Sequence, residues 1–147
     1  MTTFKTFIVL LSISAFVVDA GTPGTTRCEE KHNLSHETLV AFDNWQVPKE
    51  FRTKDENCHM HCVFEELGWM KGHTIMDDQI NSDLDPYDND FTTHLRTLLF
   101  EDCEIWEDGK RDKCKKANEV YKCLAEGYKP LDVLKKAFER AKKRSEQ

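Results

Sequence analysis

Six cysteines are the side chains with the most evident chemistry in this chain. They run from Cys28 to Cys123 with the spacing C-x29-C-x3-C-x40-C-x10-C-x8-C. An even number of cysteines in a short chain predicts disulfides if the chain is exported, and metal or redox chemistry if it stays in the cytosol. The run Cys58-His59-Met60-His61-Cys62 has the composition of a zinc cluster. Adjacent ligands on one helix diverge, however, so we expect no metal site and no cofactor.

The N-terminal residues predict export. Lys5 precedes an apolar run from Phe7 to Val18, which is too short to span a membrane and fits the core of a signal peptide. Val18-Asp19-Ala20 then offers small residues at the cleavage positions. We therefore predict a signal peptide over Met1–Ala20, a secreted extracellular protein without stable membrane insertion, and one domain over residues 21–147.

The charge of the chain argues against a nucleic-acid partner. The net charge is −6, and the basic residues are concentrated near the C-terminus, from Lys135 to Arg144. A protein whose net charge is negative repels a polyanion such as nucleic acid. The basic tail could contact an anionic surface, but lysines and arginines late in a terminal helix also complement the helix dipole and keep its outer face solvated.

Apolar residues that recur every three or four positions predict about six helices and no strand. Ser35 is the expected N-cap of one helix and Gly68 the expected end of another. In the last helix we expect the basic residues to face outward. The first predicted helix runs from Ser35 to Pro48 and has Leu39, Val40, Phe42 and Trp45 on its apolar face. The third runs from Asp77 to Leu84, and Asp85-Pro86 should end it. The others run from Glu56 to Leu67, from Tyr87 to about Cys103, from Ala117 to Ala125, and from Pro130 to Ala141.

Helical geometry limits which cysteines can pair. Cys58 and Cys62 lie four apart on one predicted helix with diverging Cβ atoms, so each should bond to another element. Cys114 and Cys123 lie nine apart, which places them on opposite faces and roughly 13 Å apart by helical rise. They should not pair with each other. Several alternative pairings remain compatible with these two exclusions.

This cysteine spacing resembles that of the insect odorant-binding protein family, of the pheromone and general odorant-binding type. The Cys58-x3-Cys62 and Cys114-x8-Cys123 spacings, the signal peptide, the acidic pI and the helix count all fit, over essentially the whole mature chain. The resemblance implies an all-α fold, a compact bundle of about six to seven helices stapled by three interlaced disulfides around a hydrophobic cavity. It also implies the pairs Cys28 with Cys62, Cys58 with Cys114, and Cys103 with Cys123.

A shorter segment is similar to the salivary odorant-binding-like proteins of blood-feeding flies. It comprises Asn44-Trp45-Gln46-Val47-Pro48 and the stretch from Cys58 through Val63-Phe64-Glu65-Glu66-Leu67-Gly68-Trp69. That similarity implies a scavenger of host amines or lipid mediators. Glu65, Glu66, Asp77 and Asp78 could then form an acidic rim for a cationic amine, although a solvated acidic face is the simpler interpretation.

A cavity for a small ligand needs apolar walls and one or two polar groups that fix orientation. The family resemblance places Trp45, Met60, Phe64 and Leu124 at positions that commonly face the ligand. Each of them could equally be a packed core residue. The full set of candidate ligand-binding residues is Trp45, Met60, Phe64, Trp69, Leu95, Leu98, Tyr121, Leu124 and Phe138.

Three further features could modify such a carrier. The C-terminal helix carries no cysteine, and its Leu131, Leu134 and Phe138 could cover the cavity as a gating lid or lie outside as a seventh helix. His59, His61 and His73 could make ligand release depend on pH. Asn33-Leu34-Ser35 is an N-glycosylation sequon, so Asn33 is a candidate glycosylation site.

The sequence does not support an enzyme. With all six cysteines in disulfides no thiol nucleophile remains, and the chain has no Gly-x-Ser-x-Gly elbow and no Gly-rich calcium loop next to a catalytic histidine. A saposin-like lipid-binding module also has six cysteines, but they cluster differently. We therefore predict a carrier of a small hydrophobic or amphipathic ligand, with the salivary scavenger as the alternative. A receptor or a homodimer is left open as a further partner.

Overall fold

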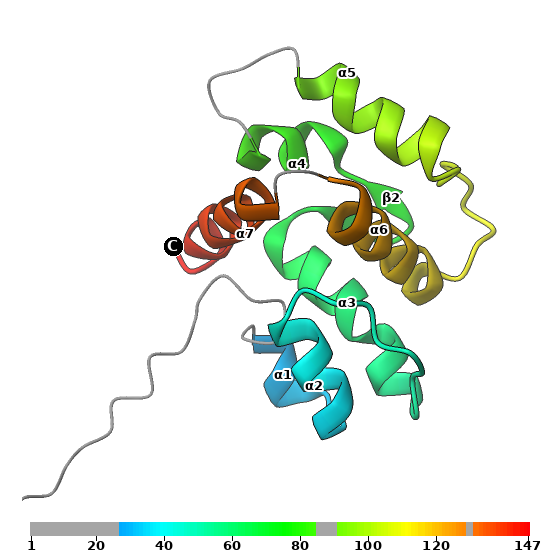
Figure 1. Ribbon diagram of the computed structural model, residues 1–147, viewed down its shortest axis with the longest axis vertical. Helices are drawn as coiled ribbons and strands as arrows, with labels where there is room; N and C mark the ends of the chain where they lie inside the picture. The colour runs from blue at the N-terminus through cyan, green and yellow to red at the C-terminus, as the bar shows by residue number, and fades with distance from the viewer. Residues whose placement is uncertain (1–26, 85–90, 129–130) are drawn as a thin grey trace, which may run out of the picture.

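The computed structural model describes residues 27–84, 91–128 and 131–147 (Figure 1). The predicted signal peptide, Asp85-Pro86, Tyr87 and Pro130 lie outside the described residues. The helices of the described part are α1 (Arg27–Lys31), α2 (His36–Asp43), α3 (Lys54–Leu67), α4 (Asp77–Leu84), α5 (Phe91–Arg96), α6 (Lys113–Gly127) and α7 (Leu131–Ser145). The prediction of an all-α bundle is confirmed.

Local capping explains where several helices begin. The hydroxyl of Ser35 accepts the backbone N–H of Thr38 at 3.3 Å and caps α2, as predicted. Thr53 caps α3 in the same way through the N–H of Glu56, and Asp112 caps α6 through the N–H of Lys115. Each cap satisfies an N–H group that has no partner inside the helix.

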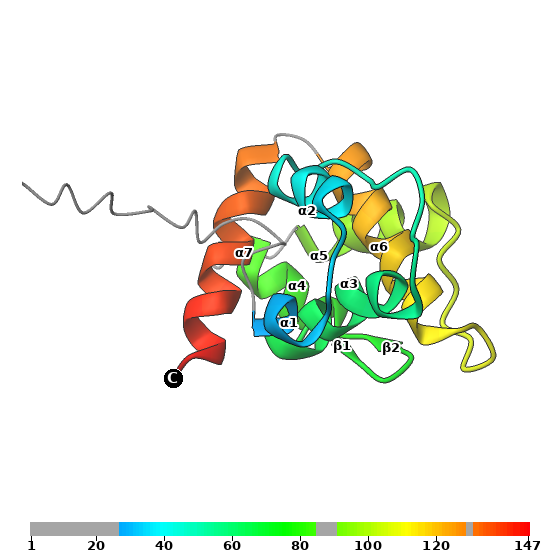
Figure 2. The same ribbon diagram turned by 90° about the horizontal axis from the view of Figure 1, so that it is seen from below.

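The helix α3 lies at the centre of the bundle. It packs most extensively against α6 and also contacts α7 and α1, while α7 additionally packs along α4. Figures 1 and 2 show α7 along one side of the molecule, on the far side of α3 and α6 from the loop that leads into α6. Because α3 contacts helices from both ends of the chain, it brings segments distant in sequence into one core.

Three disulfides connect this framework. Cys28 bonds to Cys62, joining α1 to α3, and Cys58 bonds to Cys114, joining α3 to α6. Cys103 bonds to Cys123, which joins the segment after α5 to α6. The pairing agrees with the one that the family resemblance implies, and both geometric exclusions hold.

Several local predictions were wrong. The helix that begins after Ser35 ends at Asp43, well before Pro48, and Trp45 lies beyond it. Val40 was expected on the apolar face but is 42% exposed. The short helix α1 was not predicted. Neither were the two-residue strands β1 (Met70–Lys71) and β2 (Thr74–Ile75), an antiparallel pair too short to show an alternating pattern.

The helix predicted to end near Cys103 has two parts. After α5 the chain continues into a π-helical segment, η2 (Thr97–Asp102), which ends at Cys103. The wider turn is stabilised by hydrogen bonds such as that from the Cys103 N–H to the Leu98 carbonyl at 2.9 Å. Leu98 and Leu99 are both buried there. Among the helices that the structure describes, none combines the length and apolar character required to cross a membrane.

Candidate ligand-binding core

All nine candidate ligand-binding residues lie in one continuous hydrophobic core. They come from the turn after α2, from α3 and the residue after Gly68, from α5 and η2, and from α6 and α7. None is more than 6% exposed. The structure therefore brings the predicted set together, and in it these side chains pack against one another. Whether they line a ligand cavity remains a prediction.

Aromatic rings form the middle of this core. Phe138 of α7 makes edge contacts with two indoles, that of Trp45 at a centroid distance of 5.3 Å and that of Trp69 at 5.7 Å. Trp69 also contacts Phe64 at 5.7 Å, and Trp45 lies 6.4 Å from Tyr121. Aromatic pairs at these distances add to the stabilisation that burial gives. The C-terminal helix is thus part of the core through Phe138, and it does not lie outside the bundle.

The turn after α2 places Trp45 in this cluster through a backbone conformation that is unusual for tryptophan. The Trp45 N–H bonds to the Phe42 carbonyl at 3.0 Å and the Gln46 N–H to the Ala41 carbonyl at 2.8 Å. This pair of bonds defines a Schellman motif, in which the residue at the Trp45 position adopts the left-handed conformation and is usually glycine. Trp45 has a φ of 55°. A left-handed conformation costs about 1–2 kcal/mol for a residue with a Cβ atom.

The end of α3 has the same motif with the expected residue. Gly68 has a φ of 75°, its N–H bonds to the Glu65 carbonyl at 3.1 Å, and the Trp69 N–H bonds to the Phe64 carbonyl at 2.8 Å. The contact between the Trp69 and Phe64 rings is the apolar pair that usually accompanies this motif. Both core tryptophans are therefore positioned by the same kind of helix terminus.

Two polar groups inside the core have clear partners. The Trp69 indole N–H donates to Asp83 Oδ2 at 2.8 Å, and the Tyr121 hydroxyl donates to the Gln46 carbonyl at 3.1 Å. Burial raises the pKa of Tyr121 above its usual range, because the phenolate would lose its hydration. Tyr121 therefore remains a neutral donor at physiological pH.

Two arginines attach α7 to the ends of α3 and α4. Arg140 Nε donates to the Asp83 carbonyl at 2.8 Å, and its Nη2 donates to the Leu84 carbonyl at 3.0 Å. Arg144 donates to the Leu67 carbonyl and forms an ion pair with the Asp83 carboxylate. The last carbonyls of a helix have no partner within it, so cationic donors are well suited to them. The prediction that the basic residues of α7 face outward is wrong for Arg140, which is only partly exposed, whereas Arg144 makes these contacts with 39% of its side chain still exposed.

No pattern in the sequence predicts this arrangement. Arg140 and Arg144 are four apart on the edge of the apolar face of α7, and their partners lie on other elements. Asp83, which is 5% exposed, was not predicted to be functional. A buried carboxylate near the end of a predicted helix could have suggested a cationic partner, but not which one.

The three candidate histidines have different surroundings. His59 is buried between the rings of His32 and Phe42, whereas His61 Nε2 lies 2.8 Å from the Gly72 carbonyl. His73 is exposed in the turn between β1 and β2. Within the described residues, no group of three or more His, Cys, Asp or Glu side chains is arranged to hold a metal ion.

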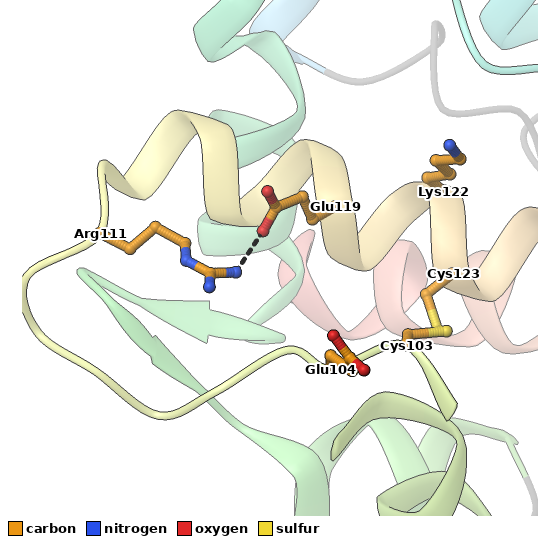
Figure 3. Close-up of a pocket in the computed structure, with 6 residues that line it drawn as sticks. All are labelled: Cys103, Glu104, Arg111, Glu119, Lys122 and Cys123. Atoms are coloured by element: carbon orange, nitrogen blue, oxygen red, sulfur yellow. Dashed lines mark hydrogen bonds and ion pairs between the residues drawn. A yellow bond between two sulfur atoms is a disulfide. The ribbon is translucent and has the colours of Figure 1, made fainter. Parts of the chain in front are cut away.

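Three pockets open at the protein surface. Figure 3 shows one of about 440 Å³ beside the Cys103–Cys123 disulfide, where Arg111 Nη1 and Glu119 Oε2 are 2.6 Å apart. Its charged lining does not suit an apolar ligand. Two others, of about 210 Å³ beside α2 and about 380 Å³ at the Cys28–Cys62 disulfide, likewise contain none of the nine candidate residues.

Comparison with known proteins agrees with this architecture. The family model described as the PBP/GOBP family matches residues 20–127. The chain belongs to this insect odorant-binding family. PBP/GOBP proteins are small-ligand carriers rather than enzymes, which agrees with the predicted function at that level. Neither the curated proteins nor the solved structures contain a match to the chain.

The matched region ends where α6 ends. It covers all six cysteines and eight of the nine candidate residues, but α7 begins after it, at Leu131. Phe138 and the two arginines that attach α7 therefore lie outside the part of the chain that matches the PBP/GOBP family. The similarity to salivary odorant-binding-like proteins finds no support in these comparisons.

Proposed function

We propose that this protein is a secreted carrier that binds a small hydrophobic odorant or pheromone among the aromatic side chains of its core. Membership of the PBP/GOBP family supports the general function of a small-ligand carrier. The observation that carries the more specific proposal is the cluster of rings at Trp45, Trp69 and Phe138, which come from three separate elements.

The physical basis of binding is the burial of apolar ligand surface. Each Å² removed from water contributes about 25 cal/mol, so a ligand gains affinity with its apolar length. The disulfides hold α1, α3 and α6 together, which reduces the ordering cost of binding on that side. We propose that α7, which has no disulfide, moves to admit the ligand and so acts as the gate.

The experiment that tests the function is calorimetric titration of the oxidised mature protein with three ligand classes. These are long-chain alcohols or esters, biogenic amines, and eicosanoids. We expect micromolar binding of the alcohols or esters, with a negative heat-capacity change that marks apolar burial. Failure of all three classes to bind would contradict the proposal.

The alternative is a scavenger of host amines or eicosanoids, and the same titration distinguishes it. The carboxylates considered as an amine-binding rim already have cationic neighbours. Asp77 Oδ2 lies within 2.5 Å of Arg96 Nε, and Glu66 Oε1 lies 3.7 Å from Arg27 Nε. These ion pairs reduce the negative potential available to an amine, so the apolar ligand is the better supported proposal.

The gate can be tested by kinetics. Deleting residues 130–147 would also remove the buried Leu134, Ala137 and Phe138, so a gentler change is preferable. Arg144→Ala weakens the attachment of α7 without removing its apolar face. We expect faster ligand release from this variant, measured by stopped-flow displacement, whereas an unchanged release rate would contradict gating by α7.

A further inference from the structure

The chain has a single N-glycosylation sequon, Asn33-Leu34-Ser35, to which the carrier function gives no role. It lies in the connection between α1 and α2, at the end of the molecule opposite α5 (Figure 1). An exported chain can therefore accept an N-linked glycan at one asparagine only. The asparagines that have neither Ser nor Thr two positions later are Asn44, Asn57, Asn81, Asn89 and Asn118.

The backbone around Asn33 directs its amide to the solvent. The Leu34 N–H bonds to the His32 carbonyl at 3.0 Å, which forms a γ-turn centred on Asn33. The residues on either side are turned inward, since Leu34 packs against the core and the His32 ring lies 5.6 Å from that of His59. Asn33 itself is exposed, and among the described residues no group forms a hydrogen bond with its side chain. The folded surface thus has room for a sugar at this amide.

The hydroxyl that completes the sequon is engaged in the folded protein. Ser35 Oγ accepts the Thr38 N–H at 3.3 Å and lies 2.9 Å from Thr38 Oγ1. The backbone N–H of Ser35 donates to the carboxylate of Glu56 in α3. A triplet fixed in this way to both α2 and α3 is not free to enter the site of another enzyme. Transfer of a glycan must therefore precede folding.

The order of synthesis provides that interval. Glu56 follows Ser35 by 21 residues, so a chain that grows at roughly 5–20 residues per second presents the sequon for about 1–4 s before Glu56 is made. Cys62, which bonds to Cys28 and holds α1, is made later still. During this time α1 and α2, with 5 and 8 residues, are too short to be stable as isolated helices.

We propose that Asn33 carries an N-linked glycan, which is added during export before α2 packs against α3. The donor is an oligosaccharide linked to a polyprenyl diphosphate lipid. Asn33 Nδ2 bonds to the anomeric carbon of the first sugar, and the bond from that carbon to the diphosphate oxygen breaks. The lipid diphosphate leaves as the anion, and Nδ2 releases one proton to a base of the transferase. This inference goes beyond ligand binding, although it rests on the export of the chain.

The test is the mass of the protein that insect cells secrete when they express the full chain. We expect treatment with a peptide N-glycosidase to lower the mass of the wild type and to leave aspartate in place of Asn33 in the corresponding peptide. Asn33→Gln should be secreted with a mass that the glycosidase does not change. Asn44→Gln is the matched control, since Asn44 is also exposed beside α2 but lies outside any sequon. It should keep the glycan.

Two substitutions of Ser35 separate the sequon from the helix cap. Ser35→Asn removes the sequon but keeps a residue that caps helices as well as serine does. We expect it to fold, to melt cooperatively and to lack the glycan. Ser35→Thr keeps both the sequon and the cap, so it should keep the glycan. A glycosidase-sensitive mass in Ser35→Asn would overturn the assignment to Asn33.

A reconstituted reaction tests the order of transfer and folding. Unglycosylated protein from bacteria is incubated with solubilised transferase and the lipid-linked oligosaccharide, either oxidised and folded or reduced and alkylated. We expect transfer to the unfolded chain only, because folding engages Ser35 with Thr38 and Glu56. Equal transfer to the folded protein would overturn the proposed order.

The outcomes distinguish this inference from the proposed function. A secreted wild type with the mass of the unmodified, disulfide-bonded chain would overturn the glycan and leave the carrier function intact. If the full chain were not secreted at all, export and glycosylation would both be overturned. Loss of ligand binding in the calorimetric titration, with the glycan present, would overturn the carrier function alone.

Discussion

Arg144 of α7 forms an ion pair with the buried carboxylate of Asp83, whose other oxygen accepts the indole N–H of Trp69 at 2.8 Å. One carboxylate therefore connects the C-terminal helix to a core tryptophan. Arg140 reinforces the connection through the backbone carbonyl of the same residue. Asp83 therefore contributes both its carboxylate and its backbone carbonyl to the attachment of α7.

We expect Asp83→Ala to lower the free energy of unfolding by about 2–3 kcal/mol. The change leaves the Trp69 N–H without its acceptor and Arg144 without its anion. The measurement is urea denaturation of the oxidised protein, with hydrogen exchange to show loss of protection in α7. Asp78→Ala on the same helix is the control. Its 86% exposed side chain lies 3.7 Å from Arg96, so we expect a loss of about 0.5 kcal/mol or less. Equal losses in the two variants would contradict the role given to Asp83.

A second prediction concerns acid stability at Glu56. Its carboxylate accepts the backbone N–H of Ser35 and, at 2.6 Å, that of Arg52. Desolvation alone would raise the pKa of Glu56, but these hydrogen bonds together with the Arg52 charge hold the pKa below its usual value of 4.5. The resulting stabilisation is complete above pH 4.5 and is lost as the pH falls through the lowered pKa.

Glu56→Gln should therefore destabilise the protein at neutral pH by about 1–2 kcal/mol and flatten the acid side of its stability profile. Thermal melting from pH 7 down to pH 3 would measure both effects. Asp55→Asn is the matched control, since Asp55 is exposed in the same first turn of α3. If the melting temperature of Glu56→Gln still fell steeply as the pH is lowered, another carboxylate would be responsible for the loss of stability in acid.

Gly68→Ala should cost about 1 kcal/mol of stability. The left-handed φ of 75° is strained for any residue with a Cβ, although the nearest atom that the new methyl group would meet is 3.8 Å away. Gly109→Ala, which meets nothing within 4 Å, should be close to neutral. Chemical denaturation of both variants provides the comparison. A neutral Gly68→Ala would mean that the turn after α3 relaxes.

The three disulfides should differ in their contribution to stability. Cys58 and Cys114 are 56 residues apart, against 20 for Cys103 and Cys123. In the chain-entropy model, replacing the first pair by alanine should cost about 4 kcal/mol and replacing the second about 3 kcal/mol. Chemical denaturation of the two double variants measures which replacement lowers the free energy of unfolding more. The reverse order would mean that packing around Cys103, and not loop entropy, dominates.

The features that could be predicted from the sequence depend on local or covalent constraints. Ser35 and Gly68 were correctly assigned because a cap acts on its own helix end. The exclusion of a Cys114–Cys123 bond followed from helical rotation alone. The positions of the core residues followed from apolar periodicity, which reports burial but does not separate a cavity wall from packed interior.

The features that could not be predicted depend on contacts between distant segments. Trp45 was placed on a helix because nothing in its own side chain favours the left-handed conformation, and burial against Phe138 compensates the strain. Arg140 and Arg144 were assigned to the solvent because the carbonyls that they bind belong to α3 and α4. Such roles require knowledge of which helix ends meet.

The disulfide arrangement also determines what the unfolded oxidised chain is like. Cys28 to Cys123 become a cross-linked network of loops, whereas the residues after Cys123 remain an ordinary flexible tail. The crosslinks remove entropy from the denatured ensemble only within that network. The helix α7 is therefore the segment whose folding must offset a full loss of chain entropy with noncovalent contacts alone. Phe138, Arg140 and Arg144 supply those contacts.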